Sequence, residues 1–354
     1  MRVLVIGGTG FIGPWVVTDL IRRDNEVAVF HRGGTANFVP SSIRHITGDR
    51  RAIADAADDI RAFKPDVVID VILSSAKQAH DIMNIVRGTA RRIVAISSID
   101  VYRACGVLHG FEPGPLEPLP LTEESPVRSQ MQTYPPEQIS KLQQVFGWLD
   151  DEYDKIPVER AVLRDPVLPG TVLRLPMVYG PGDPLHRCFP LLKRMDDRRP
   201  VILLEEKFAQ WRSPRGYVEN VAAAISLAAT SQRATGRVYN VAESKCFSEL
   251  EWARQIAGAA DWRGEFVTVA SEQAPAILKN LETWISTGLP TPAAFAKSWI
   301  IANRSILRKR SNGPWSGSVR IHHLRSMPVD LITRPKIRFW RLSIVDGMPN
   351  GGAG

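Results

Sequence analysis

The 354-residue sequence is poor in cysteine and has no long hydrophobic segment. Its three cysteines, Cys105, Cys188 and Cys246, form no C-x-x-C pair, which excludes a disulfide framework and a zinc cluster. The longest apolar stretches, such as residues 221–229, are much shorter than the roughly 18 residues that a membrane span needs. The N-terminus also lacks the pattern of a signal peptide. We therefore expect a soluble, cytoplasmic protein with no metal ion and no membrane partner.

Acidic residues are scarce only near the C-terminal end. The net charge is +8, yet residues 1–272 carry 33 Lys and Arg against 34 Asp and Glu. Residues 273–354 carry 12 against 3. The basicity therefore belongs to the last residues and says nothing about partners of the remainder. We predict a basic C-terminal extension over residues 273–354. Its basic and aromatic side chains suit nucleic acid, but its patterning is weak, and we do not expect a nucleic-acid partner.

Short apolar runs alternate with segments of helical periodicity in the first third of the chain. This alternation is typical of parallel βαβ units with helices on both faces of one sheet. The fold class that we predict is therefore α/β, a doubly wound parallel sheet of the NAD(P)-binding Rossmann type. We expect strands at residues 3–6, 26–30, 43–47, 66–71 and 92–97, and helices at residues 11–23, 52–63 and 75–87.

Proline and glycine crowd residues 105–136, which predicts a surface loop. Regular patterns resume at residue 171. We divide the chain into a Rossmann domain over residues 1–170, a smaller substrate-binding lobe over 171–272 that is interleaved with it, and the extension. In the lobe we expect strands at residues 171–175, 201–204, 238–241 and 266–269, and helices at residues 186–195, 218–230 and 248–259.

A glycine-rich turn lies directly between the first predicted strand and the first helix. It fits both G-x-x-G-x-x-G and G-x-G-x-x-G, in which glycines permit a tight turn, a close approach of the backbone to a pyrophosphate, and helix–strand packing. The N-terminus of the helix adds partial positive charge. We predict a dinucleotide site formed by Gly7, Gly8, Thr9, Gly10, Phe11, Ile12 and Gly13.

The end of the second predicted strand has no acidic residue. Dinucleotide-binding folds commonly place one there to hold the ribose hydroxyls, whereas this chain has His31 and Arg32. Arg32 suits a 2′-phosphate, so NADP(H) is slightly favoured over NAD(H). NAD held by other groups, with a solvated Arg32, remains the alternative. Asp49, after the third strand, is a candidate acceptor for the adenine amino group.

Several separated motifs resemble those of the extended and atypical short-chain dehydrogenase/reductases, the NAD-dependent epimerase/dehydratase group. The resemblance covers about residues 1–270 and implies a Rossmann fold, a small-molecule substrate and a homodimer. Beyond the glycine turn, it rests on Ser97-Ser98-Ile99-Asp100-Val101-Tyr102, Thr122-Glu123-Glu124-Ser125-Pro126, Leu173-Arg174-Leu175-Pro176-Met177-Val178-Tyr179-Gly180-Pro181-Gly182 and Gly216-Tyr217-Val218-Glu219-Asn220-Val221-Ala222.

The resemblance implies catalytic roles for a serine, a tyrosine and a lysine. Ser98 would bond the reacting oxygen, and Lys155 would hold the nicotinamide ribose and lower the pKa of a tyrosine. The family places that tyrosine four residues before the lysine, where this chain has Asp151. The nearest phenol is Tyr153, and Pro157 indicates that the helix begins near it. We predict Tyr153 and Lys155 as the acid/base pair, with Tyr102 and Tyr134 as alternatives.

Four further residues are expected near the substrate, and Met177 near the cofactor. Tyr102 and Tyr179 belong to two of the motifs above. Arg212 and Arg215 precede another, where many relatives bind a phosphate of a nucleotide sugar with an arginine. Solvated surface arginines are the equally weighted alternative for this pair.

We therefore predict an NAD(P)-dependent epimerase, dehydratase or reductase acting on a hydroxyl or carbonyl carbon of a sugar-like or nucleotide-sugar-like substrate. The alternative is a non-catalytic NAD(P)-binding relative with an RNA-binding or regulatory role. The altered tyrosine motif and the basic extension both favour that alternative.

Overall fold

A seven-stranded parallel sheet forms the centre of the molecule in the computed structural model, which describes residues 1–34 and 39–275. The basic extension, apart from its first three residues, lies outside the described residues. All strand pairs run parallel. In spatial order, the strands are β10 (Val238–Asn240), β6 (Gly170–Leu175), β5 (Arg92–Ser98), β4 (Val67–Asp70), β1 (Arg2–Ile6), β2 (Glu26–His31) and β3 (Arg44–Thr47).

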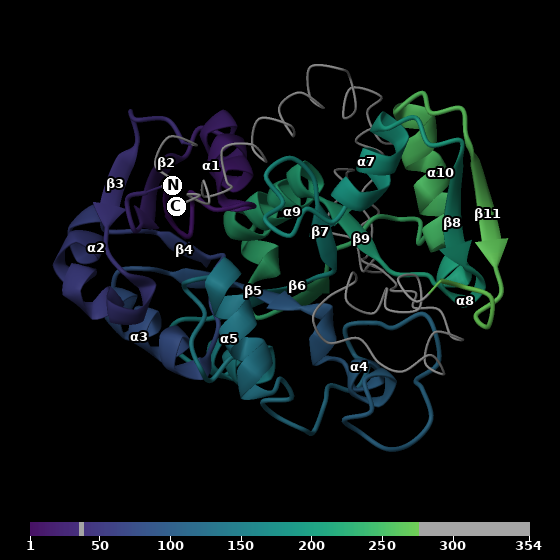
Figure 1. The fold of residues 1–354 in the computed structure, drawn as a ribbon. Coiled ribbons are helices and arrows are strands. Elements are labelled where there is room, and N and C mark those ends of the chain that lie inside the picture. The colour runs from purple at the N-terminus through teal and green to yellow at the C-terminus, as the bar shows by residue number, and fades with distance from the viewer. Residues whose placement is uncertain (35–38, 276–354) are drawn as a thin grey trace, which may run out of the picture.

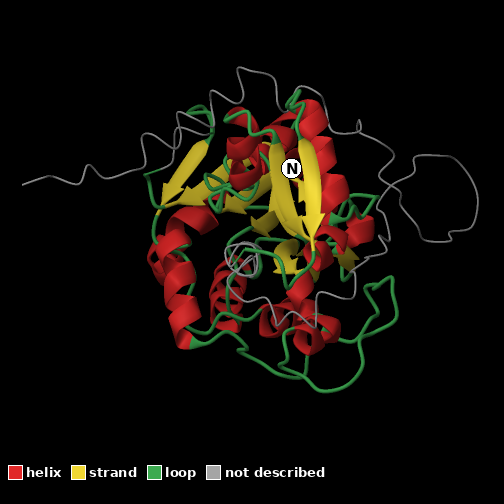
Figure 2. Cartoon of the chain, turned by 45° about the vertical axis from the view of Figure 1, so that its right-hand side comes forward, coloured by secondary structure: helices red, strands yellow, loops and turns green. Residues whose placement is uncertain are grey.

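Helices cover both faces of this sheet, as Figure 2 shows. Val3 and Val5 of β1 pack on the face of α1 (Gly13–Arg22) and α9 (Val218–Thr230). Leu4 and Ile6 point to the opposite face, as alternation along a strand requires. The helices on that second face are α2 (Ala57–Phe63), α3 (Ala76–Val86) and α6 (Lys155–Leu163). The prediction of a doubly wound Rossmann-type sheet is confirmed.

A second group of elements lies beside the sheet and extends from β7 and β9 to the right-hand side of Figure 1. Two parallel strand pairs belong to it, β7 with β9 and β8 with β11. The division into domains at residues 170 and 272 stays a prediction. The elements are β7 (Met177–Tyr179), β8 (Val201–Glu205), β9 (Arg215–Tyr217), β11 (Glu265–Val269), α7 (Phe189–Asp196), α8 (Glu206–Gln210) and α10 (Glu249–Ala259).

The loop predicted over residues 105–136 needs correction at both ends. Helix α4 (Arg103–Leu108) includes Cys105, and helix α5 (Pro136–Val145) begins where the loop was expected to end. Pro136 lies in the first turn of α5, a position that tolerates proline because its N–H has no helical partner. Residues 109–135 form neither helix nor strand. The helix predicted over residues 52–63 is also divided, into a 3-10 helix at Arg50–Ala56 and α2.

Candidate functional site

The glycine turn leaves the carboxyl end of β1 with the tight geometry that the sequence predicts. Gly7 has φ +80°, and its N–H donates to Phe30 O at 3.1 Å. A Cβ atom on Gly13 would lie 2.2 Å from Gly7 O, so only glycine fits there. A Cβ on Gly10 would approach nothing closer than 3.6 Å. No side chain caps the N-terminus of α1, which leaves its first N–H groups available to an anion.

A cavity of about 680 Å³ opens beside this turn. Its volume lies within the range of roughly 300–1,000 Å³ that is usual for ligand sites. Gly8 and Gly13 of the motif do not line this cavity, and their role is close packing: a Cβ on Gly8 would lie 2.6 Å from Val29. Seven of the residues predicted to bind the cofactor line the cavity, namely Gly7, Thr9, Gly10, Phe11, Ile12, His31 and Arg32.

The adenosine end predicted from β2 is built from His31 and Arg32. The Gly33 N–H donates to His31 Nδ1 at 2.9 Å, and His31 Nε2 lies 2.9 Å from His45 Nδ1. Burial, and secondly His45, lower the pKa of His31. Arg32 is exposed and reaches the backbone of Gly147, where a Cβ would lie 2.9 Å from Arg32 Nη1. Arg32 forms no ion pair among the described residues, although, after Arg51, its charge helps to lower the pKa of the nearby Asp49 carboxyl. A guanidinium at the cavity rim suits a phosphate.

Asp49, predicted to contact the adenine, does not line the cavity, whereas the next residue, Arg50, does. The Asp49 carboxylate accepts from Arg51 N at 2.8 Å and caps the 3-10 helix. Arg50 is 1 % exposed and donates through Nη2 to Asp70 at 2.7 Å. Its Nε and Nη1 are buried with no partner among the described residues. Such orphan donors fit a cavity that receives a polar ligand.

Another part of the cavity wall comes from residues 145–148, the end of α5 and the three residues after it. Gln78 Nε2 donates to Trp148 O at 3.1 Å, and Asp150 N donates to Ser74 Oγ at 3.2 Å. Ser75 also donates to the Asp150 carboxylate. These bonds anchor the wall to the start of α3. Trp148 belongs both to the cavity and to the surroundings of Lys155, since its ring lies 5.9 Å from the lysine Nζ.

Lys155 is the first residue of α6, and Tyr153 lies in the loop before it. This confirms the helix start that Pro157 predicts. Lys155 is 6 % exposed and donates from Nζ to Leu73 O and, at 3.1 Å, to Ile96 O. The Tyr153 ring centroid lies 5.7 Å from Nζ. The pair is therefore close together although the two residues do not share a helix face.

The pKa of both groups is shifted by burial. Burial raises the pKa of the Tyr153 phenol, and the Asp100 and Asp154 carboxylates raise it further. Burial also lowers the pKa of Lys155 to about 8, against the opposite effect of nearby carboxylates led by Asp100. Around neutral pH, Tyr153 is thus a protonated phenol next to an ammonium group. This arrangement suits donation of a proton more than its removal.

Asp100 is the residue of this cluster to which sequence reasoning gave no role. Its Oδ2 accepts from Tyr134 OH at 2.8 Å, and its Oδ1 is buried without a partner among the described residues. Ser98, partly exposed at the end of β5, accepts from Asp100 N at 3.3 Å. Tyr102 lies apart, 0 % exposed, with its hydroxyl bound to Asn240 Oδ1 at 2.7 Å. The signal for Asp100 was its place just after a central strand.

A test of the buried lysine follows from its pKa. Between about 8 and the ordinary value of 10.5, the unfolded chain binds one proton more than the folded chain, so this group makes the free energy of unfolding rise with pH. The rise is about 3 kcal/mol at most. We expect Lys155→Met to remove it, as urea denaturation at about pH 7 and about pH 9.5 would show. The same pH dependence in both proteins would contradict the assignment.

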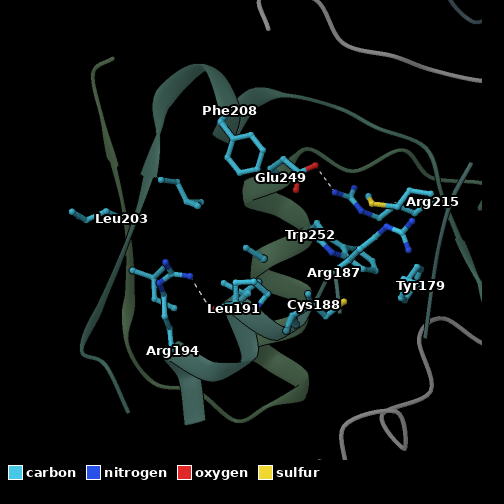
Figure 3. Close-up of a pocket in the computed structure, with 16 residues that line it drawn as sticks. Tyr179, Arg187, Cys188, Leu191, Arg194, Leu203, Phe208, Arg215, Glu249 and Trp252 are labelled. Carbon is cyan, nitrogen blue, oxygen red and sulfur yellow. Dashed lines mark hydrogen bonds and ion pairs between the residues drawn. The ribbon is translucent and has the colours of Figure 1, made fainter. Parts of the chain in front are cut away.

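The remaining substrate candidates lie in the second group of elements. Tyr179 and Arg215 line a second cavity of about 130 Å³, shown in Figure 3. Met177, which was predicted near the cofactor, lines this second cavity and not the one beside the glycine turn. Arg215 is paired with Glu249, and Tyr179 OH donates to Glu243 at 2.7 Å. Arg212 does not line this cavity and pairs with Glu251 at 2.7 Å. The structure thus brings one of the two predicted arginines to a cavity.

The sequence model of the NAD dependent epimerase/dehydratase family matches residues 3–242. The chain belongs to this family. The predicted resemblance to short-chain dehydrogenase/reductases is therefore confirmed, and so is the prediction of an enzyme, because the family and its relatives are NAD-dependent epimerases, dehydratases and reductases. This epimerase/dehydratase-family chain is 25 % identical over 291 residues to 2'-dehydrokanamycin reductase of Streptomyces kanamyceticus, with 80 % of this chain and 73 % of that protein covered.

Solved structures of the family share the fold. A UDP-glucose 4-epimerase of Thermotoga maritima, crystallised with UDP-glucose, has a TM-score of 0.58 at 15 % identity, covering 86 % of this chain and 90 % of that one. A short-chain dehydrogenase/reductase superfamily protein of Agrobacterium tumefaciens with bound NAD has a TM-score of 0.58 at 14 % identity, covering 98 % and 99 %. No helix among the described residues of this family member is long and apolar enough to cross a membrane.

Proposed function

We propose that the chain is an NADP(H)-dependent enzyme that reduces a carbonyl carbon of a sugar-like, small-molecule substrate. The observation that carries the proposal is the cavity at the end of β1, which is lined by the residues before the uncapped start of α1 and by Arg50, whose Nε and Nη1 have no partner among the described residues. The glycine turn would hold the phosphates, Arg32 the 2′-phosphate and Lys155 the nicotinamide ribose. When bound, a nicotinamide dinucleotide supplies a reversible two-electron reduction of a carbonyl carbon.

The side chains near Lys155 favour the reductive direction. Tyr153 keeps its proton at neutral pH because burial raises the pKa of its phenol. A phenol can donate this proton to a carbonyl oxygen, and the neighbouring ammonium of Lys155 stabilises the phenolate that results. Ser98 would hydrogen-bond the same oxygen. The name of the Streptomyces kanamyceticus relative, a reductase, supports the same direction.

The second candidate is a dehydratase, or an epimerase that inverts the carbon next to the redox carbon, and Asp100 favours it. These reactions need a base beside the redox carbon to remove a proton from its neighbour, and Asp100 has a buried carboxylate oxygen without a partner in the described chain. Deuterium uptake from heavy water at that neighbouring carbon distinguishes the two. A reductase incorporates none there, whereas a dehydratase or an epimerase that inverts this neighbouring carbon does.

The cofactor preference has a direct test in Arg32. We expect Arg32→Ala to weaken NADPH binding by roughly tenfold to a hundredfold, the value of a charge-assisted bond of about 1.5–3 kcal/mol, and to leave NADH binding unchanged. Energy transfer from tryptophan to the bound reduced cofactor measures both. Arg51→Ala is the matched control, since Arg51 pairs with Asp49 away from the cavity. An equal loss for both cofactors would contradict the 2′-phosphate role, and a wild-type chain that binds neither would refute the proposed function.

A further inference from the structure

The cavity of the second group of elements is small and mostly apolar. Helices α7 and α10 and strand β8 surround it, and Figure 3 shows Phe208 and Trp252 facing its interior from different elements. Its apolar wall is formed by Leu191, Ile202, Leu204, Phe208, Trp252 and Ile256. A site with such a wall gains its binding free energy from burial of an apolar surface.

Its size sets a limit on the occupant. A dry cavity of about 150 Å³ can bind a molecule of benzene, and this one measures about 130 Å³. Sites for larger ligands enclose roughly 300–1,000 Å³. The cavity therefore accommodates a single six-membered ring. A nucleoside diphosphate, with a base, a ribose and two phosphates, exceeds it several times.

Two of the three arginines in the wall are paired with carboxylates of the chain. Arg215, with a side chain 4 % exposed, pairs with Glu249 and lies 4.8 Å from the Trp252 ring centroid. Arg187 Nη1 is bound to Asp183 Oδ1 at 2.7 Å. Arg194 Nη1 donates to the Pro190 backbone oxygen at 2.8 Å. A diphosphate that approached Arg215 would therefore also meet the Glu249 carboxylate, and repulsion between these anions offsets the attraction.

The cavity lies next to the candidate catalytic groups along the sheet. Ser98, at the end of β5, is in register with Leu175 at the end of β6. Strand β7 begins two residues later, at Met177, and both Met177 and Tyr179 line the cavity. A substrate whose reacting carbon is near Ser98 can therefore place its remaining part in this cavity.

We propose that the substrate is an uncharged ring compound without a nucleoside diphosphate, and that this cavity holds one six-membered ring of it. The inference rests on the proposed function, because it assigns the substrate class of the same site. It sets this chain apart from the Thermotoga maritima structural neighbour, which was crystallised with UDP-glucose.

Binding of two probes tests the proposal without turnover. Benzyl alcohol supplies one uncharged ring, and UDP supplies the nucleoside diphosphate. We expect benzyl alcohol to bind, as ligand-observed NMR and Trp252 fluorescence would show, and Ala253→Phe to weaken it at least tenfold by filling the cavity. Gln255→Phe, exposed on the same helix, is the matched control and should leave binding unchanged. Ala253→Leu gives a smaller obstruction if the phenylalanine variant does not fold.

UDP should not bind to the wild-type chain at about millimolar concentration. In Glu249→Gln, which removes the countercharge of Arg215, UDP should still not bind at this concentration, because a nucleoside diphosphate exceeds the cavity of about 130 Å³. Micromolar binding of UDP to the wild type, abolished by Ala253→Phe, would overturn the proposal, as would absence of benzyl alcohol binding. NADPH titration of the same samples separates the proposed function from this inference. Binding of benzyl alcohol without binding of NADPH refutes only the proposed function. Binding of NADPH together with tight binding of UDP refutes only this inference.

Discussion

Tyr153→Phe and Lys155→Met are each expected to lower kcat by roughly 10²- to 10⁴-fold, the usual contribution of a positioned proton donor. Phenylalanine removes only the hydroxyl that would donate the proton. Methionine removes the ammonium that lies 5.7 Å from the phenol ring and would stabilise the phenolate. Cofactor absorbance during reduction of a panel of neutral keto sugars measures the loss. NADPH titration and circular dichroism show whether the fold persists in each variant.

Tyr134, which lies beside Tyr153, is the other candidate proton donor, and its variant shows which of the two phenols donates. Tyr134 lies 5.6 Å from Tyr153, centroid to centroid, and donates to Asp100. If Tyr134→Phe loses activity and Tyr153→Phe does not, Tyr134 is the proton donor. Tyr239→Phe, on β10, is the control for the loss of a phenol elsewhere. Full activity in both Tyr153→Phe and Lys155→Met would refute the assignment of the pair.

Asp70→Ala is expected to lower the free energy of unfolding by about 3–5 kcal/mol, because it leaves the Arg50 guanidinium buried without its countercharge. Asp70 is 0 % exposed and Arg50 1 %, and the atoms that pair lie 2.7 Å apart. Urea denaturation measures the change. Asp58→Ala is the matched control, since it breaks an exposed pair with Arg61 and should change stability by less than about 1 kcal/mol. Similar losses in the two variants would contradict the role of burial.

The sheet and the glycine turn beside the larger cavity could be predicted because their causes are local. The turn from Gly7 to Gly13 follows a strand and opens a helix, and its close contacts need glycine whatever the remote sequence does. Helix α5 could not be recognised from the sequence, because Pro135 and Pro136 at its start also fit a loop. Pro136 is compatible with the helix only because it lies in the first turn. Strands β7 and β9 have three residues each, too few for a periodic pattern.

Ion pairs and hydrogen bonds between residues that are far apart in the sequence could not be predicted either. Arg215 was a candidate for phosphate binding, but its charge is balanced by Glu249, 34 residues away, and no local pattern shows this pairing. Arg50 was not considered, because its pairing with Asp70 and its position on the cavity wall appear only when β3 folds beside β2 and β4 beside β1. Tyr102 was expected at the substrate, but its hydroxyl bonds to Asn240, 138 residues later.

The two imidazoles at the end of β2 form a hydrogen-bond chain with a single allowed direction. Because the Gly33 N–H occupies His31 Nδ1, the proton of this ring lies on Nε2 and is donated to His45 Nδ1. The proton of His45 then lies on Nε2, which faces the Pro40 carbonyl oxygen at 3.2 Å. Each ring is thus restricted to one neutral tautomer. An additional proton on the His31 imidazole would place two N–H groups against each other at the wall of the cavity beside the glycine turn, which agrees with the lowered pKa of His31.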